Sequence, residues 1–405
     1  MRIGIDISTV LNHGSDIGAG RYIFNLLKNL FAIDYEDTFV LTGRYISDDY
    51  LPLVEELKNI YAASAEQEQD RKTKLEFKLF KTTQKKLDAW NRLRLPAIET
   101  LGFAADILHC PDFMICPTFN KKIILTINDL AFIRFTHFNF DWFIKKYTKE
   151  VKRNSEAAKR IIAISQSTKN DIVKFFNTDP EKIDVTHLAA DASFRKLSPD
   201  QYDRSILEKY KIKGSYILSV GTIEPRKNYV TLIRAFNLLK SGSDRGPSHF
   251  KGTVPKLVIV GRTGWKSEAA YTEYENSIYK KDIIFVGRST DDELVHLYNM
   301  AELFVYPSKF EGFGLPVVEA MQCGLAVCAS SSSSIPELMD YKNTLFNPAD
   351  EEDIAAKIMM VLGNENLRSE LGAKSLENAK RFSWRKTAAQ TLDIYRKVYD
   401  LKVKR

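Results

Sequence analysis

Two glutamates stand on either side of a glycine-containing stretch, Glu311 before it and Glu319 after it. The stretch leads into Pro316, which suits the first turn of a helix because the N–H that proline lacks would have no partner there. Glycines let a backbone approach a ligand closely, and the amides at a helix start favour an anion such as a diphosphate. Carboxylates on both sides could then accept hydrogen bonds from the hydroxyls of a sugar on that diphosphate. Taken singly, they could also be a solvated loop acid and an acid of a helix's first turn.

An adjacent pair of cations, Arg226 and Lys227, strengthens the functional interpretation. They belong to residues 221–228, which follow an apolar run predicted to be a strand and precede a helical pattern. Basic pairs are usually solvated, but a loop after a strand lies on the ligand side of an open parallel sheet. There the two cations could neutralise a diphosphate as it leaves a sugar. We therefore expect no metal, and the chain has no Asp-x-Asp pair, the spacing that would suggest a metal-bridged diphosphate.

A third candidate is the glycine pair Gly18 and Gly20, between a first strand and a helix. The pair could begin the G-x-G-x-x-G pattern of a dinucleotide site, but Ile23 stands where the third glycine belongs. No convincing ribose-binding acid follows at the usual distance. We therefore expect no nicotinamide cofactor, and the two glycines remain candidates for contact with another ligand.

Short apolar runs that alternate with helix-length segments must position these residues. The runs predicted to be strands are residues 1–6, 39–41, 107–108, 123–126, 161–164, 216–220, 257–260, 283–286, 303–306 and 326–328. Such alternation is typical of βαβ units with right-handed crossovers, and so of a doubly wound parallel sheet in each half. A chain of 405 residues is too long for one ordinary core, and we predict two α/β domains with a boundary near residues 190–213.

The composition is that of an ordinary globular protein, with 44% hydrophobic and 27% charged residues. The four cysteines lack CxxC spacing and suitably placed histidines, so we interpret them as reduced core thiols. The N-terminus has no signal-peptide pattern, and no apolar run approaches the roughly 20 residues that span a bilayer. From these features we expect a cytoplasmic protein.

The chain has a formal net charge of +7, and basic residues cluster in residues 71–94. This segment holds nine basic and two acidic side chains among leucines and aromatics. We interpret this segment as a basic amphipathic helix. It could contact an anionic membrane surface peripherally and bring the protein to a lipid-linked substrate. The alternative is a solvated helix packed on the first domain. Nucleic acid is not an expected partner, because the basic residues cluster in one segment and no known binding module accompanies them.

Taken together, these segments resemble the family 4 retaining glycosyltransferases, whose fold is the two-domain GT-B type. The resemblance rests on the E-x7-E motif at Glu311, the loop at residues 221–228, the glycine loop at 18–22, and the segments that begin at Ile161 and Pro336. It implies two facing Rossmann-like doubly wound domains with an interdomain cleft. The implied limits are residues 1–200 for the acceptor side, 201–385 for the donor side, and 386–405 for a helix that returns to the first domain.

The resemblance also implies roles for the candidate residues. Arg226 and Lys227 would hold the donor diphosphate. Glu319 would hold the ribose, and Glu311 the sugar that is transferred. The positions that would approach the donor through their backbone are Gly18, Gly20, Gly314 and Leu315. Many relatives have His-Asp where this chain has Asn128 and the aspartate after it, a position thought to help hold the donor sugar, so the identity of that sugar stays open.

Two other polar residues follow predicted strands. His109 directly follows the run 107–108 and could contact a ligand or be a hydrogen-bonded structural residue. Asp129 could cap the next segment.

The sequence thus predicts a retaining transferase that moves a hexose such as mannose or glucose, or a related sugar, from a GDP- or UDP-sugar to a hydroxyl of a glycan or lipid-linked glycan. No carboxylate stands out as a nucleophile, so front-face attack assisted by the departing phosphate is the favoured route. The alternative is a non-catalytic scaffold subunit of a glycan-assembly complex. The intact Glu311, Arg226 and Lys227 argue against that alternative.

Overall fold

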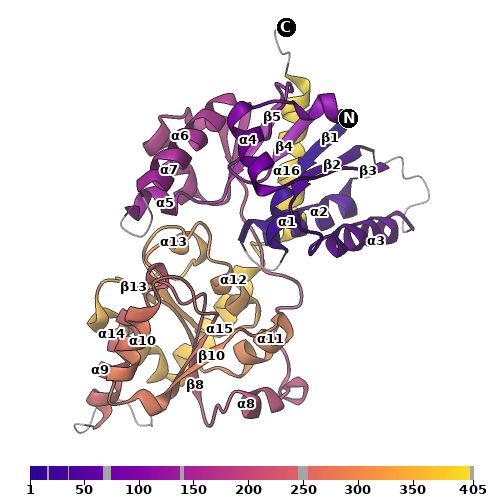
Figure 1. Ribbon diagram of the computed structural model, residues 1–405. Coiled ribbons are helices and arrows are strands. Elements are labelled where there is room, and N and C mark those ends of the chain that lie inside the picture. Colours follow the sequence, from indigo (N-terminus) through magenta and orange to yellow (C-terminus); the bar gives the residue numbers. More distant parts are fainter. Residues whose placement is uncertain (16–17, 35, 67–73, 137–140, 245–253, 402–405) are drawn as a thin grey trace. The chain divides into compact units, whose positions relative to one another are not determined.

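The computed structural model describes residues 1–15, 18–34, 36–66, 74–136, 141–244 and 254–401. The chain forms two compact units (Figure 1). The first unit combines Met1–Leu188 with Ser383–Arg405, and the second is Ala189–Phe382. The limits expected from the sequence were residues 200 and 385.

Residues 189–200 belong to the second unit because they pack on one of its helices. The Asn299 side chain accepts a hydrogen bond from the Leu197 N–H at 2.8 Å and donates one to the Arg195 carbonyl at 2.9 Å. The Phe194 ring meets Tyr298 edge-on, with 5.9 Å between ring centroids. These contacts join residues about a hundred positions apart, which explains why composition alone could not place the limit.

The first unit is built on a seven-stranded parallel sheet in the order β3-β2-β1-β4-β5-β6-β7. The strands are β1 (Arg2–Asp6), β2 (Thr38–Tyr45), β3 (Lys74–Lys81), β4 (Ile107–Cys110), β5 (Ile123–Ile127), β6 (Arg160–Ala163) and β7 (Ile183–Val185). The central strands are short and apolar, and every residue of β4 and β5 is buried, as expected of a sheet covered on both faces. The strand order reverses between β1 and β4.

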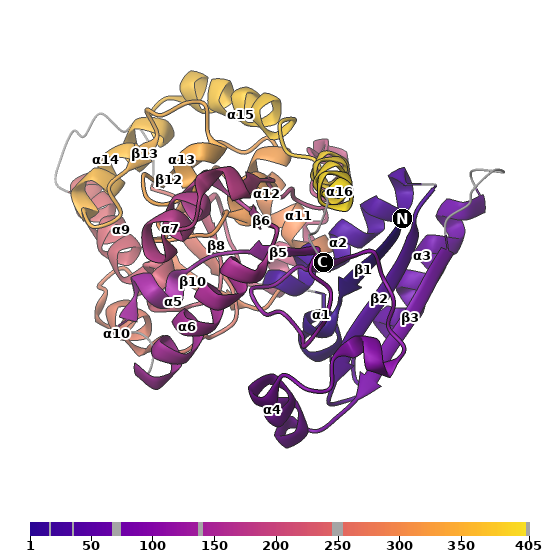
Figure 2. The same cartoon turned by 90° about the horizontal axis from the view of Figure 1, so that it is seen from above.

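Helices cover this sheet, including one from the far end of the chain. The helices are α1 (Ser8–His13), α2 (Gly18–Ile33), α3 (Pro52–Glu66), α4 (Gln84–Leu93), α5 (Ala131–Arg134), α6 (Asp141–Ala157), α7 (Gln166–Phe176) and α16 (Trp384–Asp400). Both views show α16, in yellow, beside α2 and the central strands (Figures 1 and 2). Its Tyr395 hydroxyl lies 2.6 Å from Nδ1 of His109, which fixes the helix to β4.

The predicted helix over residues 71–94 is wrong. Residues 74–81 form β3, an edge strand parallel to β2, and only residues 84–93 form a helix, α4. The reason is visible in the pattern KLEFKLFK, which largely alternates polar and apolar residues with the period of a strand. Thr83 then begins α4 by accepting a hydrogen bond from the Lys86 N–H. Residues 71–73 of the predicted helix lie outside the described residues.

The second unit has a six-stranded parallel sheet in the order β10-β9-β8-β11-β12-β13. Its strands are β8 (Tyr216–Val220), β9 (Lys256–Val260), β10 (Ile283–Gly287), β11 (Leu303–Tyr306), β12 (Val327–Ser330) and β13 (Leu345–Phe346). Its helices are α8 (Ser205–Lys209), α9 (Tyr229–Asp244), α10 (Glu268–Asn276), α11 (Asp291–Met300), α12 (Leu315–Gln322), α13 (Ile335–Leu338), α14 (Glu351–Leu362) and α15 (Glu365–Ala379). Here the strand order reverses between β8 and β11, so the loops after these two strands diverge at that point.

The prediction of a doubly wound parallel sheet in each half is confirmed. All four cysteines are buried free thiols, also as predicted. Among the residues that the structure describes, no helix is both long enough and apolar enough to cross a membrane.

Candidate functional site

The predicted cationic loop and the predicted acidic loop meet where the strand order of the second unit reverses. The cationic loop follows β8 and contains a short 3-10 turn, Pro225–Lys227. The acidic loop follows β11 and leads into α12. The Lys309 N–H donates to the Arg226 carbonyl at 2.9 Å, which joins the two loops directly. In open α/β sheets this reversal point is where ligands bind.

Asn228 holds the cationic loop in place. Its backbone adopts a left-handed conformation with φ of 63°, which asparagine tolerates better than most residues. Its side-chain amide donates to the carbonyls of Pro307 and Pro348, at 3.0 and 2.6 Å. The turn therefore presents Arg226 and Lys227 toward the loop after β11.

Glu311 is the centre of a buried charge cluster. Arg226 donates from Nη1 to Oε2 at 2.7 Å, and Lys227 donates from Nζ to Oε1 at 2.7 Å. Only 6% of Glu311 is exposed. The structure thus brings together the three residues that the sequence singled out as catalytic.

Two hydroxyl groups complete the cluster, and sequence reasoning missed both. The Tyr306 hydroxyl donates to Glu311 Oε1 at 2.8 Å and accepts a hydrogen bond from Lys227 Nζ at 2.8 Å. The Ser308 hydroxyl lies 2.5 Å from the same carboxylate oxygen. Their position could have indicated them, because Tyr306 is the last residue of β11 and Ser308 is the second residue of the loop that follows.

The charges of the cluster balance. Burial alone would raise the pKa of Glu311, but Arg226 and Lys227 outweigh it and lower that pKa to about 2. Burial lowers the pKa of Lys227, and the Glu311 carboxylate opposes this effect. Glu224 also accepts a hydrogen bond from Arg226, at 2.8 Å, so two cations face two carboxylates. Glu311 is therefore an ionised acceptor at neutral pH and has no proton to donate.

The start of α12 forms the second part of the site. Gly314 precedes the helix with φ of 112°, and a Cβ there would lie 2.7 Å from Cδ1 of Ile335. Leu315 and Pro316 open the helix, where the Leu315 amide has no partner inside the helix and favours an anion, whereas proline has no N–H and the Val317 N–H donates to the Gly314 carbonyl at 3.0 Å. Glu319 lies about one turn further on, is 4% exposed, and accepts a hydrogen bond from the Tyr298 hydroxyl at 3.0 Å.

The remaining predicted site residues belong to the first unit. Gly18 begins α2 with φ of 53°, and a Cβ there would meet nothing within 4 Å. A Cβ on Gly20 would lie 2.0 Å from the Gly14 carbonyl oxygen, so close packing already explains this glycine. Asn128 follows β5, and its carbonyl accepts a hydrogen bond from the Thr168 hydroxyl at 3.1 Å. Residues 16 and 17, directly before the glycine loop, lie outside the described residues.

His109 has a structural role. Its ring is completely buried, with Nδ1 2.6 Å from the Tyr395 hydroxyl and Nε2 2.8 Å from the Thr126 hydroxyl. Burial lowers its pKa to about 3, so the ring is neutral. Asp129 accepts a hydrogen bond from the Ala131 N–H at 2.9 Å, and so caps the turn that follows β5.

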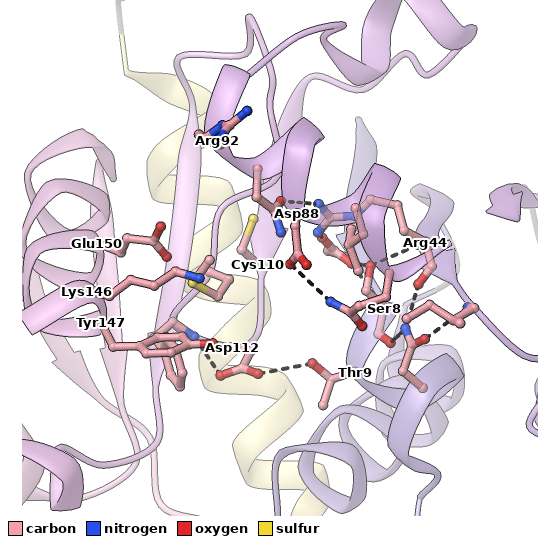
Figure 3. A pocket seen from close by; sticks show the side chains of 18 of the residues that line it. Ser8, Thr9, Arg44, Asp88, Arg92, Cys110, Asp112, Lys146, Tyr147 and Glu150 are labelled. Carbon is pink, nitrogen blue, oxygen red and sulfur yellow. Dashed lines mark hydrogen bonds and ion pairs between the residues drawn. The ribbon is translucent and has the colours of Figure 1, made fainter. Parts of the chain in front are cut away.

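A cavity of about 930 Å³ opens in the first unit (Figure 3), and it was not predicted from the sequence. It lies at the ends of β1 and β4, where the strand order of this sheet reverses, between α4 and α6. At the sheet edge, Asp112 accepts hydrogen bonds from the Thr9 hydroxyl at 3.1 Å and from the Phe113 N–H at 2.7 Å. Burial raises the pKa of Asp112. A proline and this aspartate directly after a predicted strand were the signal that could have indicated the site.

One described group of side chains could be considered for a metal. Asp6, Cys110 and Cys116 place one ligand atom each within 4.8 Å of the others. The Asp6 carboxylate is already bonded to Ser8 and lies 3.4 Å from the Arg44 guanidinium. A hydrogen bond to Cys116, together with burial, raises the pKa of Cys110 well above its usual value. Because the Asp6 carboxylate is already engaged by Ser8 and Arg44, we describe this group as a buried thiol pair.

The sheet orders define a doubly wound α/β protein in each unit, with charged loops at the reversal point of the second. The family model "Glycosyltransferase Family 4" matches residues 18–194, and "Glycosyl transferases group 1" matches residues 204–378. Together the two matches extend over most of the chain. The chain therefore belongs to glycosyltransferase family 4, and it is a glycosyltransferase.

Similar proteins agree with this assignment. The O-antigen chain mannosyltransferase B of Escherichia coli is 29% identical over 383 residues, which cover 94% of this chain and 96% of that protein. The serotype-specific mannosyltransferase WbdA of Escherichia coli is 34% identical over 235 residues, 58% of this chain and 28% of that protein. The crystal structure of Anabaena Alr3699/HepE in complex with UDP and glucose has a TM-score of 0.70 at 15% identity, over 97% of this chain and 98% of that one. This likeness shows the fold, which is of the GT-B type.

Proposed function

We propose that the protein transfers a hexose from a nucleoside-diphosphate sugar to a hydroxyl of a glycan, with retention at the anomeric carbon. Mannose is the favoured sugar, because the relative that matches this chain over nearly its full length is named a mannosyltransferase. A GDP- or UDP-sugar is the donor class, a choice supported by the UDP and UDP-glucose complexes of the structural neighbour. A glycan acceptor fits the O-antigen assignment of the same relative.

The observation that carries this proposal is the Glu311 cluster beside the start of α12. The Glu311 carboxylate forms ion pairs with both Arg226 and Lys227. A bound diphosphate would compete for these cations and leave the Glu311 oxygens able to accept hydrogen bonds from sugar hydroxyls. As the bond from the sugar to the diphosphate breaks, negative charge grows on the phosphate, and the cations and the α12 amides stabilise it.

Retention is proposed to occur without a covalent intermediate on the protein. The Tyr306 and Ser308 hydroxyls donate to Glu311 Oε1 at 2.8 and 2.5 Å, contacts for which a bound diphosphate does not compete, and they make this carboxylate a poor nucleophile. We infer front-face attack, in which the acceptor hydroxyl bonds to the anomeric carbon while the diphosphate leaves. The hydroxyl proton passes to the departing phosphate oxygen. The two cations supply the charge that a metal would otherwise supply, so the transfer needs no metal.

The acceptor is assigned to the cavity of the first unit, which combines Asp112 with aromatic and amide side chains. Carboxylates, amides and aromatic faces are the groups that recognise a sugar by hydrogen bonding and stacking. Cytoplasmic location and peripheral membrane contact stay part of the proposal. Leu93 and Leu95 at the end of α4 are each 62% exposed next to basic residues of that helix, which supports such contact.

Nucleoside-diphosphate binding tests the donor half of this proposal. A ligand that binds only the folded state raises the melting temperature, and we expect GDP or UDP to raise it, with the nucleoside alone far weaker. Lys227→Ala should remove the difference between the diphosphate and the nucleoside. Equal shifts for both ligands in the wild type would contradict a diphosphate site at this cluster. A non-catalytic scaffold is not favoured, because the complete charge cluster has no evident purpose in it.

A further inference from the structure

We propose that the acceptor bound by the cavity of the first unit carries a phosphate or diphosphate close to the sugar that is glycosylated. This inference rests on the proposed function and adds the chemical class of the acceptor. It comes from the charges that line the cavity. A neutral glycan would form no ion pair with those charges.

Six cationic side chains line the cavity, of which one forms an ion pair and five do not. Arg44 lies 3.4 Å from the Asp6 carboxylate and donates to the Asn91 side chain at 3.0 Å. The other lining cations are Lys85, Arg92, Lys146, Lys149 and Arg153. Within the part of the chain that the structure describes, none of these five has an ion-pair partner.

The lining carboxylates do not balance the five cations. Apart from Asp6, they are Asp88, Asp112 and Glu150. Asp88 accepts a hydrogen bond from Gln84 at 3.0 Å, and Asp112 accepts one from the Thr9 hydroxyl. Five cations against three carboxylates leave an excess of two positive charges, a match for a phosphate monoester, which carries about −1.5 to −2 at pH 7, or for a diphosphate diester.

The cations reach the cavity from two helices. On α6, Lys146, Lys149 and Arg153 are three and four residues apart, the spacing of one helix face. On α4, Lys85 and Arg92 line the opposite wall. Figure 3 shows Lys146 and Arg92 on different sides of the same space. Two walls of like charge attract a multivalent anion more strongly than either helix alone.

The floor of the cavity suits a sugar instead of a phosphate. There the Asp112 carboxylate accepts a hydrogen bond from Thr9, and burial raises its pKa. Tyr147 and Phe113 add aromatic rings, whose centroids are 5.8 Å apart. The receiving sugar therefore lies on Asp112, and its phosphate lies between α4 and α6.

Two acceptors that differ only in the diphosphate group test the proposal. One is a mannosyl disaccharide with an octyl diphosphate at its reducing end, and the other is the matching octyl glycoside. Calorimetry without donor should give the diphosphate at least tenfold tighter binding. In Lys149→Gln with Arg153→Gln, this advantage should fall at least tenfold while binding of the glycoside stays the same.

The same helix offers a matched control. Lys145 and Lys152 are exposed on α6 but do not line the cavity, so Lys145→Gln with Lys152→Gln removes the same charge elsewhere. The control should keep the full advantage of the diphosphate. Lys227→Ala should keep it too, which excludes binding at the donor site. Equal affinity for both acceptors, or equal losses in the two double variants, would overturn the proposal.

Vesicle binding distinguishes an acceptor phosphate from a lipid headgroup. If the lining variant loses only binding to phosphatidylglycerol vesicles and still binds the soluble diphosphate normally, the cations bind lipid headgroups and the proposal is wrong. Because the acceptor affinities are measured without turnover, a failure of the proposed transfer reaction would show separately, as a lack of product from a donor sugar.

Discussion

At the residue scale, the proposed reaction depends on Glu311 being ionised and shared by two cations. Glu311→Gln keeps the shape of the side chain but leaves the buried Lys227 and the half-buried Arg226 without their shared anion. Because breaking a buried ion pair costs about 3–5 kcal/mol, the variant should be clearly less stable as well as almost inactive. Urea unfolding and initial transfer rates measure the two effects. Wild-type stability together with wild-type turnover would remove Glu311 from the site.

The same carboxylate gives a prediction about pH. Its pKa is lowered from 4.5 to about 2 in the folded protein, so the stability that it contributes is present above about pH 4.5 and is lost as the pH falls toward 2. The free energy of unfolding of the wild type should therefore fall more steeply over this range than that of Glu311→Gln. Parallel curves for the two proteins would show that the carboxylate is not held by the cations.

The two cations should act on the leaving group. Arg226→Ala and Lys227→Ala should each lower kcat by about 10²–10³, the usual effect of losing one donor to a developing negative charge. Lys309→Ala is the matched control, because Lys309 is an exposed cation of the facing loop. Steady-state kinetics with varied donor distinguish the three variants. A loss in Lys309→Ala equal to the others would indicate a general effect of surface charge.

At the element scale, the start of α12 is fixed by one glycine. In Gly314→Ala, a φ of 112° and a Cβ 2.7 Å from Ile335 should destabilise the protein by about 1–3 kcal/mol and weaken nucleotide binding. Gly242→Ala is the control, because that glycine lies in α9 with nothing within 4 Å, and alanine there should stabilise the helix by about 0.5–1 kcal/mol. Thermal unfolding of both variants, with and without GDP or UDP, measures these effects. Gly314→Ala with normal stability would show that α12 begins differently.

Elements also show where sequence prediction succeeds. Apolar runs predict most of the strands, because buried parallel strands are continuous hydrophobic stretches. They miss β3, since its polar residues are those of an edge strand and they merge with the basic residues of α4 into one charged segment. β7 and β13 have only three and two residues, too few for a pattern. The corrected elements weaken the case for a membrane helix and leave α4 as the part to test.

Membrane contact should now depend on α4 alone. Lys85→Glu with Lys86→Glu should abolish binding to phosphatidylglycerol vesicles at low salt, because each basic residue near an anionic surface contributes about 1 kcal/mol. Lys58→Glu with Lys213→Glu, two exposed lysines outside α4, serves as the control for net charge. Cosedimentation measures the binding. If the wild type ignores such vesicles at low ionic strength, α4 has no membrane role.

At the scale of the whole molecule, the sequence predicted the cationic and acidic loops but not their surroundings. Arg226, Lys227 and Glu311 follow strands, and parallel strands bring their carboxyl ends to one edge. The contacts of Tyr306 and Ser308, and the cavity between α4 and α6, depend on distances between segments that no spacing in the sequence encodes. The sequence thus singled out the charged residues, and the fold shows which groups contact them.

The stereochemistry of the product tests the central claim most directly. The protein would be incubated with GDP-mannose or UDP-glucose and a glycan acceptor, with and without EDTA. The configuration of the product would be read from the proton NMR signal of its anomeric hydrogen. We predict a new glycosidic bond with the anomeric configuration of the donor, formed at the same rate with and without EDTA, and lost in Glu311→Gln. A product of inverted configuration, or a rate restored only by a divalent cation, would contradict the proposed mechanism.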